Sequence, residues 1–494
     1  MQNRRHFLRN LGITGSLLAI PSAMLKAEPR VKPDHIDLST IVLKGKVQSQ
    51  GKGIANVAVT DGMNVTLTDK NGQYELASNA TAQFVYISVP SGYAIPANKG
   101  IAAFYKPVSK AAGTYDFNLT KLEIDDRKHN FVVWADTQVI SKADVELMMT
   151  QSVPDLQALV KTYPKGTLFH GIGCGDLVWD HFELFEDYKK AVELSDIPFY
   201  NVIGNHDMDI NARSDDKSAD TFKQQFGPTY YSFNRGNIHY VTLDDVFFIG
   251  TAKKYIGYIT ENQLQWLEQD LAQVKPGSTV VVSLHIPTQT GQARRDNKEE
   301  ELGGSVANRQ QLFKLLAPYK VHIMSGHTHF NDNWEDGNIM EHNHGTVCGA
   351  WWTGPICGDG TPAGYGVYEV DGNDVKWYYK STGLSKEKQL RIYPKGKLKD
   401  APEEISVNAW NWDNKWKVEW FEDGVSKGQM EKRVAYDPWA VELYAGPKLP
   451  KKHPFVEPTL NDHMFFAKPS ANAKRITVKA TDRFGVVYEE SMDL

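Results

Sequence analysis

The stretch Gly204-Asn205-His206-Asp207 places an amide, an imidazole and a carboxylate directly after an apolar run at residues 199–203. An apolar run of this length is typical of a short buried strand, and a glycine at its end permits a sharp turn. Amide, imidazole and carboxylate groups suit metal ligation and proton transfer. Taken alone, the tetrapeptide fits an ordinary Gly-Asn turn equally well. The other strand ends must therefore decide between the two interpretations.

Four further apolar runs also end at residues that can bind a metal. These residues are Asp136 with Gln138, Asp176, His285, and His327 with His329. Each end alone has a plain explanation, such as a turn at Gly175-Asp176 or surface alternation at His327 and His329. Unrelated surface choices would not repeat at five strand ends. Because ligands of open α/β sheets bind at the carboxyl ends of the strands, the side chains are expected to meet there. Their oxygen and nitrogen donors suit hard or borderline divalent ions.

The elements that must position these residues follow from the alternation of apolar and amphipathic stretches. Strands are predicted at residues 131–135, 167–174, 199–203, 239–243, 280–284 and 321–324. Helices are predicted at residues 143–162, 181–195, 261–274 and 308–317. The third helix opens on Thr260-Glu-Asn-Gln263, which is a capping-box pattern. This alternation predicts an α/β sheet with helices outside.

Short alternating strands flank the central part on both sides. Asp61-Gly62 and Asn71-Gly72 are hairpin signals, and they predict a β-sandwich at residues 40–125 that resembles carboxypeptidase-regulatory-like modules of exported bacterial proteins. Similar turns predict a second β-sandwich at residues 384–494. The first sandwich has no convergent polar set, so a spacer or substrate-presenting role is expected for it.

The first 27 residues resemble a twin-arginine export signal, with Arg4 and Arg5 as the pair and residues 28–39 as a linker. The apolar stretch at residues 11–25 is interrupted by glycine and proline, which makes it a poor membrane span. The resemblance predicts a bacterial host and a periplasmic or secreted mature chain without a transmembrane segment.

The composition is that of an ordinary soluble globular protein, with 494 residues, 41% hydrophobic and 23% charged. A net charge of -5 gives no support to nucleic-acid binding. The three cysteines are too few for a disulfide framework or a thiolate metal cluster. Cys348 and Cys357 could pair, or remain buried thiols.

The ordered set of strand ends resembles the calcineurin-like metallophosphoesterase superfamily over a domain predicted at residues 128–383. The matching pieces are Asp136-Thr-Gln138, Gly175-Asp176, Gly204-Asn-His-Asp207, His285, and Gly326-His-Thr-His329. The resemblance implies an α/β fold in which a central β-sandwich is flanked by helices. With a small all-β domain on each side, the layout also resembles an exported bacterial subgroup.

The resemblance implies two divalent metal ions, which would be Mn, Fe, Zn or Mg. Asp176 would bridge them, one ion also binding Asp136, Gln138 and His329, and the other Asn205, His285 and His327. A hydroxide activated between the two metals would hydrolyse a phosphate monoester or diester. His206 would assist the leaving group, and Asp207 would orient its ring.

Two positions depart from the patterns of related enzymes. Gln138 stands where the superfamily usually has histidine, and a neutral amide oxygen is the weaker ligand. Three roles are open for Gln138: ligation of the metal, contact with a metal-bound water, or a position away from the ion. The first metal site is therefore expected to be weaker and to prefer Mn, Mg or Fe over Zn. Trp179 stands where purple acid phosphatases need tyrosine, and an indole offers no such ligand, which argues against the purple variant.

Candidate substrate contacts are Trp351 and Trp352, which could wall the cleft, and Arg294, which could clamp a second phosphate. Core packing of the tryptophans and a solvated loop around Arg294 are the alternatives. The expected partner is a small-molecule, glycan-linked or lipid-linked phosphate ester. A second hypothesis is a non-catalytic envelope or carbohydrate-binding protein on the same scaffold, which only the change at Gln138 favours.

Overall fold

The computed structural model describes residues 40–109, 113–251 and 253–494. The predicted export signal and the linker at residues 28–39 lie outside these ranges. Across the described ranges, every helix is too short or too polar for a membrane crossing.

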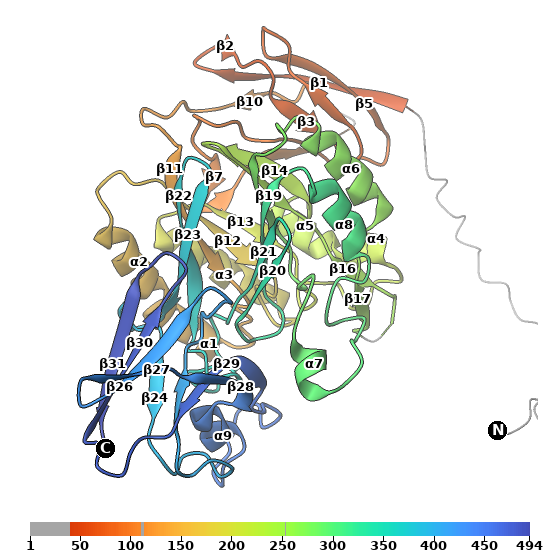
Figure 1. Cartoon of the computed structure of the whole chain (residues 1–494). Coiled ribbons are helices and arrows are strands. Elements are labelled where there is room, and N and C mark those ends of the chain that lie inside the picture. The colour runs from red at the N-terminus through yellow and green to blue at the C-terminus, as the bar shows by residue number, and fades with distance from the viewer. Residues whose placement is uncertain (1–39, 110–112, 252) are drawn as a thin grey trace, which may run out of the picture. The chain divides into compact units, whose positions relative to one another are not determined.

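The first central sheet has the strand order β23-β22-β11-β12-β13-β8-β7. Figure 1 labels β11, β12, β13, β22 and β23 in the central part of the chain. Its strands are β7 (Ala97–Asn98), β8 (Ile101–Ala102), β11 (Lys128–Trp134), β12 (Phe169–Cys174), β13 (Phe199–Val202), β22 (Gly364–Asp371) and β23 (Asp374–Ser381). Strands β11, β12 and β13 are parallel, so their carboxyl ends meet at one edge.

The second central sheet has the order β14-β15-β18-β19-β21-β20. Its strands are β14 (Tyr231–Arg235), β15 (Ile238–Thr242), β18 (Thr279–Ser283), β19 (Lys320–Ser325), β20 (Asp332–Asp336) and β21 (Ile339–Asn343). Strands β15, β18, β19 and β21 are parallel, with an antiparallel strand at each edge. All six strands predicted for the central region are present.

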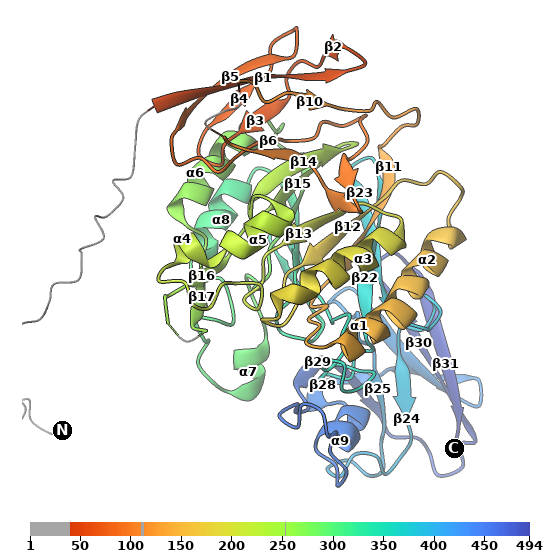
Figure 2. The same ribbon diagram turned by 180° about the vertical axis from the view of Figure 1, so that it is seen from behind.

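The two sheets pack face to face, and helices cover their outer faces. On β11, Phe131 and Val133 belong to the core between the sheets, whereas Val132 and Trp134 belong to the core beneath the helices. The first sheet packs against α2 (Val153–Thr162) and α3 (Phe185–Ser195), and the second against α6 (Glu261–Leu271) and α8 (Arg309–Leu316), as Figure 2 shows from behind. Burial on both faces explains why the strands are almost continuously apolar.

The helix predicted at residues 143–162 is interrupted in the structure. It consists of α1 (Lys142–Leu147), a π-helical turn η1 (Met148–Ser152), and α2. Pro154 has no N–H to donate into the preceding turn, so the backbone widens there before α2 begins. The helix predicted at residues 181–195 likewise starts as a 3-10 turn, η2 (Phe182–Leu184), before α3.

The predicted capping box at Thr260 is wrong. Thr260 occupies the N-cap position of α6 but its side chain makes no cap hydrogen bond. The Gln263 amide instead bonds the backbone of Asp244, accepting from its N–H at 2.9 Å and donating to its C=O at 2.7 Å. The backbone of Asp244, just after β15, thus binds the Gln263 side chain that a capping box would need at the start of α6.

The N-terminal region is β-rich, but part of it joins the central sheet. Its strands are β1 (Thr40–Ser49), β2 (Lys52–Gly53), β3 (Ala58–Thr60), β4 (Val65–Leu67), β5 (Gln73–Asn79), β6 (Phe84–Ile87), β9 (Tyr105–Pro107) and β10 (Phe117–Asn118). Strand β8, however, pairs in parallel with β13, and β7 pairs with β8. Residues 97–102 therefore differ from the predicted separate sandwich of residues 40–125 and extend the first central sheet.

The C-terminal region packs two antiparallel sheets around its own core. Its elements are β24 (Arg391–Tyr393), β25 (Ile405–Asn408), β26 (Lys417–Glu422), β27 (Val425–Gln429), β28 (Glu431–Tyr436), α9 (Pro438–Tyr444), β29 (Leu460–Ala467), β30 (Arg475–Thr481) and β31 (Val487–Asp493). The loops of the central region add α4 (Asp215–Ser218), α5 (Asp220–Phe226), β16 (Val246–Phe248), β17 (Tyr255–Gly257) and α7 (Gln292–Asp296). The fold is thus α/β, with β-rich regions on both sides of the central sandwich.

Candidate metal centre

The seven predicted ligands come from the carboxyl ends of strands in both central sheets. Asp136, Gln138, Asp176 and Asn205 follow strands of the first sheet, and His285, His327 and His329 follow strands of the second. Six of the seven residues are buried, and His327 is half-buried. The two sheets therefore each supply part of the same polar cluster.

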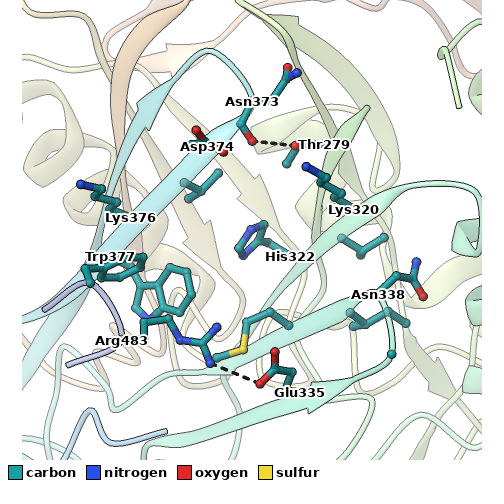
Figure 3. A pocket seen from close by; sticks show the side chains of 16 residues that line it. Thr279, Lys320, His322, Glu335, Asn338, Asn373, Asp374, Lys376, Trp377 and Arg483 are labelled. Atoms are coloured by element: carbon teal, nitrogen blue, oxygen red, sulfur yellow. Dashed lines mark hydrogen bonds and ion pairs between the residues drawn. The ribbon is translucent and has the colours of Figure 1, made fainter. Parts of the chain in front are cut away.

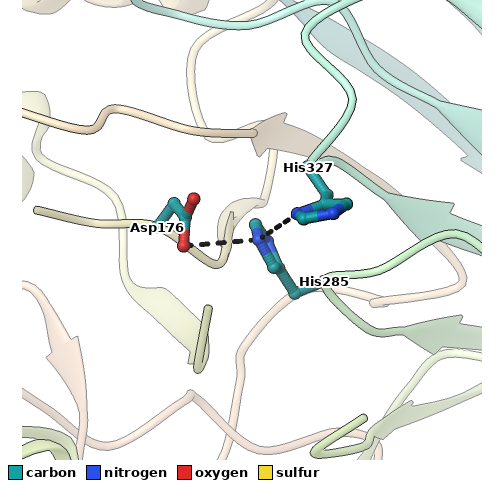
Figure 4. Close-up of side chains that lie close together, drawn as sticks. All are labelled: Asp176, His285 and His327. Carbon is teal, nitrogen blue, oxygen red and sulfur yellow. Dashed lines mark hydrogen bonds and ion pairs between the residues drawn. The ribbon is translucent and has the colours of Figure 1, made fainter. Parts of the chain in front are cut away.

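Three of these residues hold their donor atoms within 4.8 Å of one another: Asp176, His285 and His327 (Figure 4). His285 Nε2 lies 3.3 Å from Asp176 Oδ1 and 3.1 Å from Asn205 Oδ1. His327 Nδ1 lies 3.3 Å from His285 Nε2. Two imidazole nitrogens, a carboxylate and an amide oxygen thus converge on one small volume.

The remaining predicted ligands adjoin this group at two points: Gln138 contacts Asp176, and Asp136 with His329 contacts the backbone of His327. The Gln138 amide donates to Asp176 Oδ2 at 3.0 Å, and His329 Nε2 lies 3.4 Å from Asp136 Oδ1. The backbone N–H of His327 donates to both oxygens of Asp136, at 3.1 and 3.0 Å. The structure therefore brings all seven predicted side chains into one connected cluster.

The backbone at this cluster adopts an uncommon conformation. The φ angles of five of the predicted ligands lie between 38° and 71°, at Asp136, Gln138, Asp176, His327 and His329. A non-glycine residue held in the left-handed region costs on the order of 1–3 kcal/mol, and such residues gather at functional sites. The surrounding structure over-determines this strained arrangement.

Two glycines allow the carboxylates to approach the neighbouring backbone. A Cβ on Gly204 would lie 2.2 Å from Asp176 Oδ1, and one on Gly326 would lie 2.5 Å from Asp136 Oδ2. Any side chain at either position would displace a carboxylate of the cluster.

The donor set fits a divalent cation. The Oε1 atom of Gln138 is buried and has no hydrogen-bond partner among the described residues. Such an oxygen costs free energy unless something binds it. Together with imidazole nitrogens and carboxylate oxygens, it is a ligand type that divalent ions of intermediate hardness accept.

The charges of the cluster are strongly coupled. Burial lowers the pKa of His285, but the Asp176 carboxylate outweighs it and raises that pKa to about 10. Burial would raise the pKa of Asp176, yet His285 and His206 lower it, so this carboxyl group is ionised. Burial and the neighbouring His285 lower the pKa of His327 to about 4, which leaves a neutral imidazole available as a ligand.

His206 lies beside the cluster, and Asp180 holds its ring. His206 Nδ1 is 3.1 Å from Asp180 Oδ1, and Lys253 forms an ion pair with the same carboxylate. Burial lowers the pKa of His206, but the charge of Asp176 and the hydrogen bond to Asp180 outweigh it, so the pKa is raised. The sequence prediction missed Asp180, whose only signal is its position four residues after Asp176.

Asp207 does not orient the His206 ring, contrary to the prediction. Its buried carboxylate accepts the backbone N–H groups of Gly204, Leu177 and Val178, at 2.9, 3.1 and 3.1 Å. Burial, followed by the charge of Asp176, raises the pKa of Asp207 to about 7. Asp207 therefore ties the loop after β12 to the loop after β13. The carboxylate that faces the His206 ring is that of Asp180, which is distant in the sequence but adjacent in space.

The three tentative substrate residues have different surroundings. The Trp351 ring stacks on His329, with centroids 4.0 Å apart. The Trp352 Nε1 donates to the Thr137 carbonyl at 2.9 Å, and its ring packs against the core under the helices. Arg294 forms an ion pair with Asp462 of β29. Trp351 alone of these three is in ring contact with a predicted ligand.

All three cysteines are reduced, and Cys348 Sγ lies 3.8 Å from Nδ1 of the predicted ligand His329. Cys174, Cys348 and Cys357 are buried free thiols, so the possible Cys348–Cys357 disulfide is not formed. A cavity of about 440 Å³ opens near the amino ends of β18 and β19, lined by Lys320, His322 and Arg483 among others (Figure 3). None of the predicted site residues, all of which the structure describes, lines this cavity.

Similar proteins share the central part of the chain. Over 199 residues it is 29% identical to the serine/threonine-protein phosphatase CPPED1 of Pongo abelii, covering 38% of this chain and 60% of that protein. Over 155 residues it is 27% identical to the probable glycerophosphodiester phosphodiesterase GpdQ of Arcobacter nitrofigilis, covering 30% and 51%. The chain thus spans half to three fifths of the curated relatives it matches. A purple acid phosphatase structure from yellow lupin aligns with 70% of this chain and 68% of its own, at 13% identity and a TM-score of 0.36.

Three family models match successive parts of the chain. Residues 41–122 match the model described as N terminal of calcineurin-like phosphoesterase, and residues 341–488 match the one described as C terminal of calcineurin-like phosphoesterase. Residues 129–331, which include every predicted metal ligand, match calcineurin-like phosphoesterase itself. The chain belongs to the calcineurin-like phosphoesterase family.

Proposed function

We propose that this protein is a metal-dependent hydrolase of phosphate esters. The observation that carries the proposal is the meeting of seven oxygen- and nitrogen-bearing side chains from both sheets, with the His206 ring beside them. Family membership and the phosphatase and phosphodiesterase names of the relatives support the same reaction class. The retained His206 favours an enzyme over a non-catalytic binding protein.

We assign two ions to the cluster. Asp136, Gln138 and His329 would hold one, Asn205, His285 and His327 would hold the other, and Asp176 would be common to both sets. Divalent ions bound there supply positive charge for the phosphate and promote ionisation of water. The ligand side chains determine where the positive charge of the ions lies. The buried carboxylates of Asp136 and Asp176 neutralise only part of that charge.

His206 is assigned the proton transfer. Because Asp180 faces Nδ1, Nε2 is the nitrogen that turns toward the substrate. The raised pKa favours the protonated form of the ring, which can donate a proton to the departing oxygen. Asp180 and Lys253 act through the ring rather than on the substrate, which makes them positioning residues.

The proposal is tested with p-nitrophenyl phosphate and bis-p-nitrophenyl phosphate, using protein loaded with Mn. We expect turnover of at least one ester, and the ratio of the two rates separates a monoesterase from a diesterase. Asp176→Asn is the matched control, because it removes the shared carboxylate charge at nearly constant volume. Absence of turnover with both esters on metal-loaded protein would instead favour the binding-protein hypothesis.

Gln138 is proposed to make the first ion site the weaker of the two. Its amide oxygen is a neutral ligand, and its amide nitrogen already donates to Asp176. After dialysis we expect one ion to be retained more firmly than the other, and Gln138→His to raise retention of Zn. Stoichiometric Zn at both positions of the unaltered protein would contradict this assignment.

The place of action stays a prediction. The twin-arginine-like residues 1–27 indicate export to the periplasm or secretion, and we propose this location for the mature chain. Cell fractionation of a tagged full-length chain, compared with Arg4→Lys/Arg5→Lys, tests it.

A further inference from the structure

A cavity of about 490 Å³ opens beside the predicted ligand His329 and its stacking partner Trp351. The opposite wall comes from the C-terminal region, through Tyr436 and residues 455–460. Helix α7 and Lys298 after it supply a third part of the lining, and Thr328 and Gly358 complete it. The C-terminal region therefore reaches the metal centre, although its own core lies elsewhere.

Aromatic rings connect this cavity to His206. We call Trp179, Trp351, His453 and Phe455 the aromatic wall. Within it, Phe455 lies 5.4 Å from Trp351 and 6.0 Å from Trp179, and His453 lies 5.1 Å from Trp179, measured between ring centroids. Trp179 in turn lies 5.4 Å from His206. The wall thus runs from the proton donor to the metal ligand His329.

Phe455 leaves much of its ring open to solvent. It is 54% exposed, and Tyr436 across the same cavity is 45% exposed. A large apolar ring held open beside a reaction centre is available to a ligand, since aromatic rings recognise other rings through their faces and edges.

The cations that line this cavity are already paired with carboxylates. Arg295 Nη1 pairs with Asp332 at 2.9 Å and with Asp462 at 3.1 Å. Lys298 lies 3.8 Å from Asp296. Because each of these lining cations faces a carboxylate, the cavity suits an uncharged part of a substrate rather than a second phosphate.

We propose that the aromatic wall is a subsite for an uncharged ring carried by the alcohol part of the phosphate ester. Phe455 and Trp351 would stack on that ring while the phosphate lies at the metal ligands. The inference rests on the proposed phosphoesterase activity and adds the class of leaving group. The ring can be a nucleobase or a hexose, since both present a face that aromatic side chains bind.

The test compares three phosphate monoesters of primary alcohols, which have similar leaving groups. These are glycerol 1-phosphate without a ring, glucose 6-phosphate with a hexose, and uridine 5′-monophosphate with a nucleobase. We expect Phe455→Ala to lower kcat/KM about 10-fold for at least one ring-bearing ester, chiefly through KM. Glycerol 1-phosphate should change by less than about twofold. The ester that responds identifies the ring.

Leu449→Ala is the matched control, because Leu449 is a 50% exposed apolar residue on the same connecting segment, outside the cavity lining. It should leave all three esters within about twofold of the unaltered protein. Equal losses for the glycerol ester and the ring-bearing esters in Phe455→Ala would overturn the subsite.

Failure of the subsite and failure of the activity are distinguishable. If p-nitrophenyl phosphate is hydrolysed but Phe455→Ala changes kcat/KM equally for all three monoesters, the subsite is wrong and the activity stands. If neither p-nitrophenyl ester nor any of the three monoesters is hydrolysed, the activity is wrong. Wherever the three monoesters are not hydrolysed, including a strict diesterase, tryptophan fluorescence decides on the subsite. Saturable quenching by glucose 6-phosphate or uridine 5′-monophosphate that is lost in Phe455→Ala supports it, and identical titrations of the two proteins overturn it.

Discussion

Histidines lie at both ends of the central strands, and the pKa values of His285 and His329 are shifted in the opposite direction from those of His129 and His322. His327, also at the carboxyl ends, has a lowered pKa because burial and the neighbouring His285 both disfavour its charge. At the carboxyl ends, burial lowers the pKa of His285 and His329, but neighbouring groups, with Asp176 foremost for His285 and Cys348 and Asp136 for His329, raise it to about 10. Near the amino ends, burial and a neighbouring arginine lower the pKa of His129 and His322 to about 4. The same residue type is thus part of a candidate ligand set at one end and a neutral core group at the other.

The difference shows that a histidine by itself does not mark a site. His129 and His322 lie within strands β11 and β19 and hydrogen-bond to Tyr240 and His342. His285 lies after its strand and faces a carboxylate. Position at a strand end, together with an acidic neighbour, is what separates a ligand from a packed core residue.

The largest expected difference in turnover and bound metal is between two histidine-to-alanine variants, one at the carboxyl ends of the central strands and one near their amino ends. We expect His285→Ala to lower turnover by at least about 10²-fold and to lower the bound metal, since even partners of metal ligands cost 10–100-fold. His322→Ala should keep its metal and lower only stability. Elemental analysis and p-nitrophenyl phosphate turnover of both variants measure this. Equal metal content in the two would contradict the comparison.

His206→Ala separates proton transfer from metal binding at the same end. Turnover should fall by about 10²–10⁴-fold, the usual contribution of a positioned general acid. Metal content should match the unaltered protein, because His206 faces Asp180 rather than the ligand cluster. Metal loss in this variant would mean that His206 is itself a ligand.

The core histidines should make the protein sensitive to acid. Their folded pKa is lowered, so below pH 6.5 the unfolded chain binds protons that the folded chain does not. Stability is full above pH 6.5 and declines as the pH falls toward about 4, by up to about 3 kcal/mol for His129 and by less for His322, which is half-buried and lines a cavity. Urea unfolding at pH 7, 6 and 5 measures the slope. The slope of the free energy of unfolding against pH reflects how many protons the chain takes up on unfolding. His129→Gln should reduce this number by one, and an unchanged slope would count against a neutral His129.

Asp180→Asn should have the smallest effect. Turnover is expected to fall about 10-fold, because the ring loses its orientation while the proton donor remains. Since Asp180 raises the pKa of His206, the variant should lose activity at a lower pH on the alkaline side of its profile. Asp180→Glu should recover part of both effects. A fall in turnover with an unchanged pH profile would point to a structural role only.

The sequence was informative wherever local pattern and chemistry coincide. Every predicted central strand is present, and the predicted ligands at their ends form one cluster. The contacts that depend on distant segments were not predictable, because no local pattern encodes them. Asp180 took the place assigned to Asp207, and Phe455 reaches the centre from the C-terminal region. Gln263 failed as a capping residue for the same reason, since the end of β15 offered its amide another partner.

The division of the ligands between two sheets has a consequence for how the chain folds. Asp136 follows the first strand of one sheet, and His329 follows a strand of the other, far along the chain. Contacts of such large sequence separation form late, because their loop-closure entropy must be overcome first. An intermediate with only one sheet in place would lack half of the donors. Recovery of activity during refolding therefore reports when the two central sheets have packed together. We expect it to lag behind the recovery of secondary structure.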